Sequence, residues 1–503
     1  MKRGLKGYLL LILVMLFCIG CGKTDSDTNS KEITCVDDLE GAKIGVQLGT
    51  VADIYATDYE GDDAGTKVER FNKSAEAIQA LKQNKIDCVI VDEQPAKKFV
   101  EDESSLKILD DAFAKEDYAI CIAKGNDELV TKVNGALDKL EAEGTIAKIT
   151  ANYIGDDTKG SFQYESPDGI KYDNGTLVVA TNAAFPPYEY YENGEVTGID
   201  IDLVRAIGDK LGMKIEIEEM EFDSIINAVN SKKADLGVSG ISKTEEREKA
   251  INFSRAYTTA NQVIIVNTSD AGDSSSGIVD DIKKCFVDDA RWQYIVKGLC
   301  NTIIIAVCAV AIGLLLGFLV AVIRCTHDKN NTLGFLNWIC KVYLTVTRGT
   351  PMMIQLLIIY YIIFASVNIN KIFVAVIAFG INSGAYVAEI MRGGIMSIDD
   401  GQMEAGRSLG FTYAHTMTLI IIPQAIKNAL PSLANEFISL IKETSICGYI
   451  GLLDLTRGGD IIRSITYEAF LPLIAVALIY LALVQLLTFA VGKLERGLRK
   501  NEQ

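Results

Sequence analysis

The chain has 503 residues, which corresponds to about three structural units at roughly 150 residues per domain. It contains 66 acidic and 49 basic residues, and the formal charge of -17 argues against binding to the phosphate backbone of nucleic acids. The two histidines, His327 and His415, belong to no His/Cys cluster with metal-ligand spacing, so no metal site is expected. The first half is charged, whereas the part after residue 290 carries long uncharged apolar runs, which excludes a disordered chain and a purely soluble enzyme.

Residues 1–21 have the pattern of an export signal. Lys2 and Arg3 are followed by an apolar run from Tyr8 to Ile19, which is short for a membrane span. Gly20 and Cys21 resemble a lipoprotein cleavage site, at which Cys21 would become the lipidated N-terminus. The alternative is an uncleaved anchor. The polar residues 22–35 read as a linker.

Residues 36–155 alternate β-like and helical patterns. Strands are expected over 42–47, 88–91 and 118–123, and helices over 75–83 and 127–153. Such alternation predicts an α/β sheet domain. Residues 156–174 are rich in Gly, Asp and Ser and read as a linker.

Residues 175–267 repeat this alternation. Strands are expected over 176–181, 214–218, 234–238 and 261–266, and helices over 198–211 and 224–231. Residues 268–289, which begin with a Ser/Gly/Asp-rich stretch, form a further linker.

Several motifs of residues 175–267 resemble the first lobe of a periplasmic-type solute-binding protein for polar amino acids. They are Val179–Asn182, Phe185–Tyr188, Gly198–Asp200, Gly240–Thr244 and the pair Glu246-Arg247. Residues 36–155 resemble the second lobe with its closing helices. The resemblance implies a two-lobed (type II) α/β fold, with the lobes in reversed chain order. Circular permutation of one domain, joined through 156–174, would explain this order. The alternative is two tandem domains that have each lost half.

A free amino acid presents an ammonium and a carboxylate, and an arginine can donate two parallel hydrogen bonds to the carboxylate. The resemblance places Arg247 at the carboxylate and Asp92 at the ammonium, in a cleft that closes by a hinge. It assigns supporting contacts to Gly240, Ser242 and the backbone of Thr50 and Val51, a stacking role to Phe185 and Phe222, and selectivity to Asn182, Gln47 and Glu221. Asn182 stands where relatives often have Asp, so a basic ligand is not assured.

Five apolar runs follow, and together they predict an all-α transmembrane domain over 290–497. They cover residues 303–323, 351–367, 372–388, 426–453 and 470–491. Five crossings from an outside binding domain place Arg324, Lys329, Lys341, Arg348 and the basic C-terminal tail in the cytoplasm, as the positive-inside bias requires. The fourth run contains Lys427, Glu436, Lys442 and Glu443, which either face a water-filled path or reach to the interface.

The segment between the third and fourth runs contains Glu404-Ala405-Gly406, then Gly410, then Ile420-Ile421-Ile422-Pro423. This spacing resembles the EAA loop of ABC importer permeases of the polar amino acid uptake class, with Gly406 in place of Ala and Ile422 in place of Leu. The resemblance implies a short cytoplasmic helix that docks in a groove of a separate ATPase subunit.

The sequence has no Gly-x4-Gly-Lys-[Ser/Thr] phosphate loop, so ATP and magnesium are expected on the partner subunit and no catalytic residue is assigned here. The combined prediction is a receptor fused to a permease, which acts as a homodimer in the cell membrane and imports polar amino acids, glutamine or glutamate above all. A ligand-gated ion channel or a sensory receptor with the same binding fold is the alternative. A disulfide among Cys35, Cys88 and Cys121 also remains open.

Overall fold

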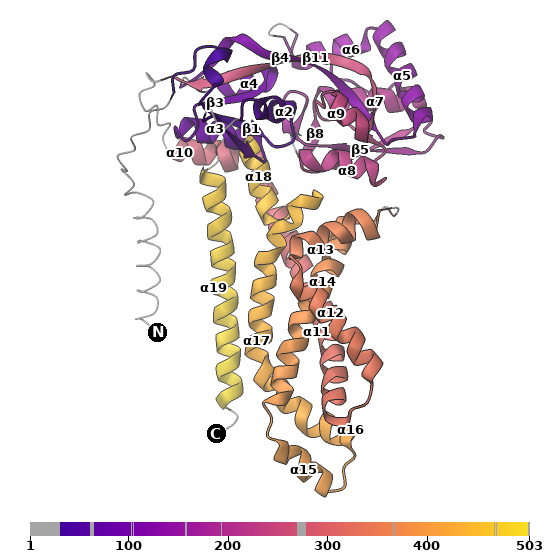
Figure 1. The fold of residues 1–503 in the computed structure, drawn as a ribbon, viewed down its shortest axis with the longest axis vertical. Coiled ribbons are helices and arrows are strands. Elements are labelled where there is room, and N and C mark those ends of the chain that lie inside the picture. Colours follow the sequence, from indigo (N-terminus) through magenta and orange to yellow (C-terminus); the bar gives the residue numbers. More distant parts are fainter. Residues whose placement is uncertain are drawn as a thin grey trace.

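The computed structural model describes residues 31–500, except 61–64, 102, 104, 156–157, 193, 269–277, 366, 368, 467 and 469. The predicted export signal and Cys21 lie outside these residues. The α/β region occupies one end of the molecule, and long helices extend from it (Figure 1).

A single eight-stranded sheet runs through both α/β segments of the chain. Its order is β2 (Lys67–Phe71), β1 (Lys43–Gln47), β3 (Cys88–Asp92), β11 (Asn252–Asn267), β4 (Leu106–Ile122), β10 (Leu236–Gly237), β5 (Thr176–Thr181) and β9 (Lys214–Glu219). The long strands β4 and β11 pair antiparallel along most of their length. The C-terminal part of β11 pairs with β3, whereas the C-terminal part of β4 pairs with β10. These two strands therefore connect the lobes.

Short helices cover this sheet. They are α2 (Val51–Thr57), α3 (Ser74–Lys82), α4 (Glu93–Glu101), α5 (Asp127–Ala142), α6 (Thr145–Tyr153), α7 (Ile199–Leu211), α8 (Ile225–Asn230) and α9 (Glu245–Ala250). A small antiparallel sheet of β6 (Ala184–Phe185), β7 (Glu189–Glu192) and β8 (Glu195–Thr197) lies in the second segment. The predicted two-lobed α/β fold is confirmed.

Each lobe has a core built from both chain segments. In the lobe around β5 (lobe 1), Leu137 of α5 packs in one core with Val179 and Leu203. In the lobe around β1 (lobe 2), Ile264 of β11 packs with Ile44. We infer from this exchange that the two segments fold as one binding domain, because two separate half-domains would leave these apolar faces in water.

The helix predicted over 127–153 is interrupted. α5 and α6 are separated at Gly144, whose φ of 69° is a left-handed conformation that ends α5. The apolar spacing continues across the break because both helices pack on the same core, through Leu137 and Ile149. The strand predicted over 261–266 is the end of the much longer β11.

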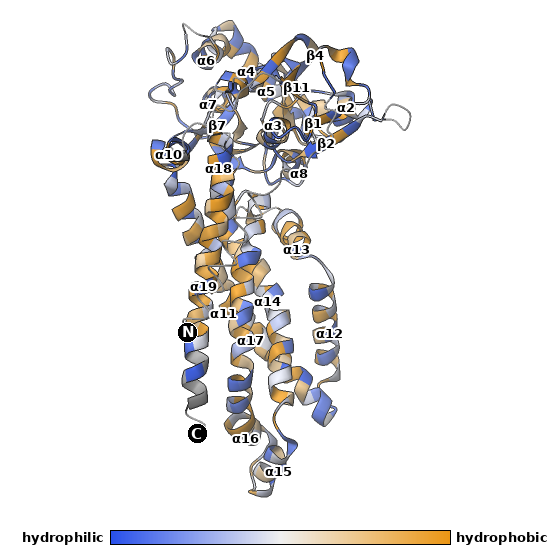
Figure 2. Ribbon diagram, turned by 90° about the vertical axis from the view of Figure 1, so that its left-hand side faces the viewer, coloured by the Kyte–Doolittle hydropathy of each residue, from blue (hydrophilic) through white to orange (hydrophobic). Residues whose placement is uncertain are grey.

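The helical region contains three described helices that are long and apolar enough to cross a membrane, within α11 (Trp292–Asn330), α14 (Lys371–Met396) and α19 (Phe470–Lys500). A fourth candidate is the pair α12 (Gly334–Gly349) and α13 (Met352–Ile358), bent by 110°. The second arm of this bent pair, Met352–Ile363, lies within the predicted span 351–367. In Figure 2, α19 is mostly hydrophobic, whereas α12 alternates hydrophilic and hydrophobic residues along its length.

The predicted span 426–453 corresponds to α17 (Ile422–Glu443) and η7 (Thr444–Ile450). Glu436 is half-buried against α14, where its carboxylate accepts a hydrogen bond from Ser383 at 3.1 Å. Lys427 and Lys442 are exposed near the two ends of α17. The charges of this helix therefore divide between an interior contact and its ends.

The helices α11 and α14 pack closely through glycines spaced four residues apart. A Cβ atom at Gly317 of α11 would lie 2.6 Å from the Val387 side chain of α14. A Cβ atom at Gly380 of α14 would lie 2.8 Å from Ile312. Small residues at this spacing let two helix backbones approach within a membrane.

Candidate functional site

One small cavity between the lobes brings together ten of the eleven residues predicted to contact the ligand, all except Glu221. They are Gln47, Thr50, Val51, Asp92, Asn182, Phe185, Phe222, Gly240, Ser242 and Arg247. Ser239 and Gln262 line it as well, and the sequence analysis missed both. Gln262 could have been found because it lies opposite Asp92 in the pairing of β11 with β3. The binding role of these residues stays a prediction.

Arg247 is held from both lobes. Thr244 caps the N-terminus of α9, and Arg247 lies in the first turn of that helix. Its guanidinium donates to the Ser242 carbonyl at 2.8 Å and, across the cleft, to the Gly49 carbonyl at 2.7 Å. Both acceptors are neutral, so its positive charge remains available to a carboxylate ligand.

Asp92 lies at the carboxyl end of the buried strand β3. Its carboxylate accepts hydrogen bonds from the hydroxyl of Tyr118 and the amide of Gln262. Burial raises the pKa of Asp92 to about 6, although the hydrogen bonds and Arg247 oppose this change. A carboxyl group with this pKa is ionised at neutral pH and can pair with an ammonium.

Glu116 is a second buried carboxyl group beside the cavity, and the sequence analysis did not identify it. One of its oxygens accepts a hydrogen bond from the Ser242 hydroxyl, and the amide of Gln262 also interacts with this carboxylate. Burial and the nearby charge of Asp92 raise the pKa of Glu116 to about 7. No motif marks this residue, because it becomes part of the site only when β4 crosses between the lobes.

Two aromatic rings form apolar walls. The Arg247 guanidinium carbon lies 5.9 Å from the centroid of the Phe222 ring. Phe185 packs against the backbone at Gly240, where a Cβ atom would lie 2.9 Å from the Phe185 ring. Gly240 also has a φ of 51°, so glycine is required at this position for two reasons.

The predicted selectivity residues divide between two places. Asn182 donates to the Met220 carbonyl at 2.7 Å, and Gln47 accepts from the Ser74 hydroxyl at 2.8 Å, and both line the cleft. Glu221 does not line the cleft. Its carboxylate pairs instead with the buried guanidinium of Arg457, which belongs to α18 (Leu455–Thr466) of the helical region.

The cleft cavity is about 20 Å³, which is room for about one water molecule. The hydrogen bond from Arg247 of lobe 1 to the carbonyl of Gly49 in lobe 2 spans the cleft and keeps the cavity closed. Since an amino acid is larger than one water molecule, the lobes have to separate before a ligand can enter.

The binding domain contacts the helical region through ion pairs from both lobes. Arg457, only 3% exposed, pairs with Glu219 and Glu221 of lobe 1. Lys371 of α14 lies 2.5 Å from Glu218, and Arg463 of α18 lies 3.0 Å from Glu76 of α3 in lobe 2. The helical region therefore contacts both halves of the structure that has to open and close.

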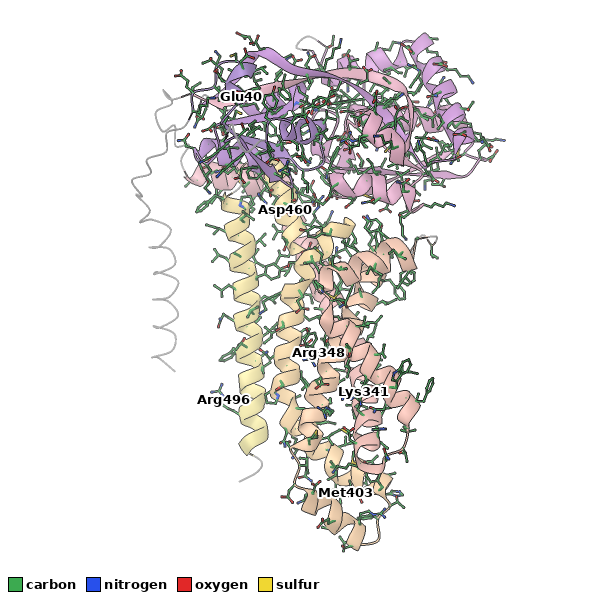
Figure 3. The ribbon with its side chains drawn as sticks, in the orientation of Figure 1. Glu40, Lys341, Arg348, Met403, Asp460 and Arg496 are labelled. Atoms are coloured by element: carbon green, nitrogen blue, oxygen red, sulfur yellow. The ribbon has the colours of Figure 1, made fainter. Side chains whose placement is uncertain are left out.

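The EAA-like segment lies at the opposite end of the helices, in α15 (Asp400–Ser408) and α16 (Tyr413–Thr416). Figure 3 shows Met403 of this segment far from Asp460, which lies where the helices meet the binding domain. Glu404 and Ala405 are exposed. Gly410 has a φ of 86° between the two short helices, and Pro423 begins α17. A Cβ atom at Gly406 would lie 2.6 Å from Thr416, which explains glycine in place of alanine.

Cys35, Cys88 and Cys121 are free thiols in the structure. Among the described residues, no group of three or more His, Cys, Asp or Glu side chains has the arrangement needed to hold a metal ion.

The family of bacterial extracellular solute-binding proteins, family 3, matches residues 61–156 and 177–445. The arginine transport system permease ArtQ of Bacillus subtilis is 40% identical over 211 residues, which cover 42% of this chain and 94% of the relative. A permease of Rickettsia typhi named for glutamine transport (GlnP) is 40% identical over 212 residues, which cover 41% of this chain and 94% of the relative. A solved amino acid ABC transporter with histidines is 39% identical and covers 44% of this chain and 99% of its own, with a TM-score of 0.40.

Proposed function

The chain belongs to the bacterial extracellular solute-binding proteins, family 3, fused to an amino acid ABC permease, and we propose that it captures a polar amino acid outside the cell and passes it through its own membrane helices. Two copies enclose the path, and a separate ATPase subunit binds ATP and magnesium. The C-terminus lies in the cytoplasm. In Figure 3, Lys341 and Arg496 lie away from the binding domain, which supports this orientation.

The observation that carries the proposal is the pairing of opposite charges in one cleft. Arg247 of lobe 1 and Asp92 of lobe 2 line the same cavity, and both are buried. An amino acid zwitterion carries the complementary pair of charges. The ligand would join the lobes by taking over the contact that Arg247 now makes with Gly49.

The substrate class that we propose first is a glutamine- or glutamate-like amino acid, held by the amides of Asn182 and Gln47. A specific observation favours a second candidate, a cationic amino acid. Asp92 and Glu116 are two carboxyl groups beside the single guanidinium of Arg247. The positively charged side chain of a cationic amino acid would therefore find a second carboxyl group to neutralise it. The permease ArtQ is named for arginine transport, which supports this second candidate.

Calorimetric titration of the purified full chain with L-glutamine, L-glutamate and L-arginine tests the substrate. Binding of glutamine or glutamate is expected under the first candidate, and binding of arginine selects the second. No binding of any of the three would refute the proposed function.

The coupling to an ATPase predicts a distinct behaviour for Glu404→Lys. Reversal of this exposed charge should reduce uptake into vesicles containing the ATPase to background, because the partner loses its contact. Amino acid binding to the same variant should be unchanged, since Glu404 lies at the far end of the helices. Glu128→Lys, on an exposed face of α5, is the control and should transport normally. Normal uptake by Glu404→Lys would refute the role of this loop.

A further inference from the structure

A second cavity lies beside the ligand cleft, where both lobes meet the helical region. Its volume is about 200 Å³, against about 20 Å³ for the cleft. By the measure that gives the cleft room for about one water molecule, this cavity has room for a small polar molecule. Phe222 lines both cavities, so its side chain lies on the boundary between them.

Three parts of the molecule form the walls of this cavity. Lobe 2 contributes Lys73 and Glu76, and lobe 1 contributes Asp223 beside Phe222. The helical region contributes Gly448 and Tyr449 of η7 and Thr456, Arg457 and Asp460 of α18. Figure 3 shows Asp460 at the junction of the binding domain with the helices. The cavity therefore lies between the cleft and the membrane helices.

Lys73 is an unpaired cation in this wall. Lys73 directly precedes α3 in the chain, and it is only 6% exposed. Among the described residues, its ammonium has no hydrogen bond or ion pair, and burial lowers the pKa of Lys73. Asp460, Glu221 and Glu219 lie near enough to favour its charged form without forming an ion pair, so an anionic group in direct contact would stabilise the buried ammonium further.

The other charges of the cavity are mostly engaged. Arg463 holds Glu76 at 3.0 Å and Asp460 at 2.8 Å, and Arg457 pairs with Glu221. Asp223 accepts hydrogen bonds only locally, from Ser224 and its own backbone, and forms no ion pair among the described residues. One cation of lobe 2 and one carboxylate of lobe 1 are thus left for a ligand.

We propose that this cavity is a second binding site for a zwitterionic amino acid, with Lys73 at its carboxylate and Asp223 at its ammonium. The inference rests on the proposed function as an amino acid carrier. The site receives the amino acid when Phe222 moves aside and holds it next to the permease helices, before it enters the membrane path.

Calorimetric titration of the full chain in lipid nanodiscs, with L-glutamine and L-arginine as probes, tests the site. The wild type should bind two molecules of one probe per chain. Arg247→Met should remove the binding event of the cleft and leave the other. Lys73→Met should weaken the second event about tenfold or more, whereas Lys73→Arg keeps it. Lys85→Met, an exposed lysine of the same lobe, is the control and should leave both events unchanged.

Gly448→Leu tests the cavity without removing any charge. A Cβ atom at Gly448 would lie 3.7 Å from Arg457, an ordinary contact, so the leucine side chain can extend into the cavity. This variant should lose the second event, keep the first and retain the melting temperature of the wild type. A single binding event that Arg247→Met abolishes would overturn the second site and leave the proposed function intact. No binding of either probe to the wild type would overturn both.

Discussion

Arg247 and Asp92 are positioned by contacts that neutralise neither of them completely. The acceptors of Arg247 are neutral carbonyl groups, and the donors to Asp92 are a hydroxyl and an amide. Each side chain is therefore fixed in orientation while its charge remains available. This is the arrangement in which a charged ligand gains most from burial, because it adds the missing counter-charges to a site that is already ordered.

The raised pKa of Asp92 predicts pH-dependent binding. A carboxyl group with a pKa of about 6 becomes protonated as the pH falls below 6, and an uncharged carboxyl attracts an ammonium only weakly. Affinity for the amino acid should therefore be about tenfold lower at about pH 5 than at about pH 7.5. Titration calorimetry at the two values measures the difference. Asp92→Asn should bind weakly and with a smaller pH dependence, because only Glu116 of the two buried carboxyl groups then remains to titrate. Equal wild-type affinities at both values would contradict the prediction.

The elements of the helical region are held together by close backbone approach. Gly317 and Gly380 each lie against a side chain of the facing helix, so α11 and α14 contact one another without space for a further methyl group. In the EAA-like segment, Gly406 packs on Thr416 in the same manner. Small residues in these elements therefore determine how closely the helices pack.

Gly317→Leu should destabilise the helical region. The side chain would collide with Val387, 2.6 Å from the Cβ position, and overpacking of this kind costs about 1–3 kcal/mol. The melting temperature of the purified chain in detergent should fall. Gly393→Leu is the matched control, because a Cβ atom at Gly393 of α14 has no neighbour within 4 Å. Equal melting temperatures for the two variants would show that the glycine contact is not required.

At the scale of the whole molecule, the ion pairs at the domain junction connect both lobes with the helical region. Arg457 and Lys371 hold lobe 1, whereas Arg463 holds lobe 2. Separation of the lobes would change the distance between these attachment points. We therefore expect opening of the cleft to be accompanied by movement of α18.

Arg457→Met should loosen this junction. The substitution leaves Glu219 and Glu221 without their buried counter-charge, and loss of one partner of a buried pair costs about 3–5 kcal/mol. Backbone amides of α18 and β9 should exchange hydrogen for deuterium faster than in the wild type. Lys210→Met removes a more exposed ion pair with Glu143 and should leave both elements protected. Unchanged exchange in Arg457→Met would exclude a docking role for Arg457.

The sequence by itself determined the features that depend on local pattern. Alternating β and helical periodicities predicted the α/β lobes, the long apolar runs predicted the membrane helices, and the spacing of Glu404, Gly410 and Pro423 indicated the EAA-like segment, whose coupling role stays a prediction. The resemblance carried over ten cleft residues, which the structure places around one cavity. These features are encoded in residues that are close together in the chain or in motifs that keep their spacing.

Only the tertiary structure decided the contacts between distant segments. It joined residues 36–155 and 175–267 in one sheet, paired Glu221 with Arg457 rather than placing it in the cleft, and brought Glu116 beside Asp92. It also left Lys73 buried and unpaired in a cavity shared by three parts of the molecule. The physical reason is that burial and ion pairing depend on which surfaces meet after folding, and a one-dimensional pattern contains no record of those partners.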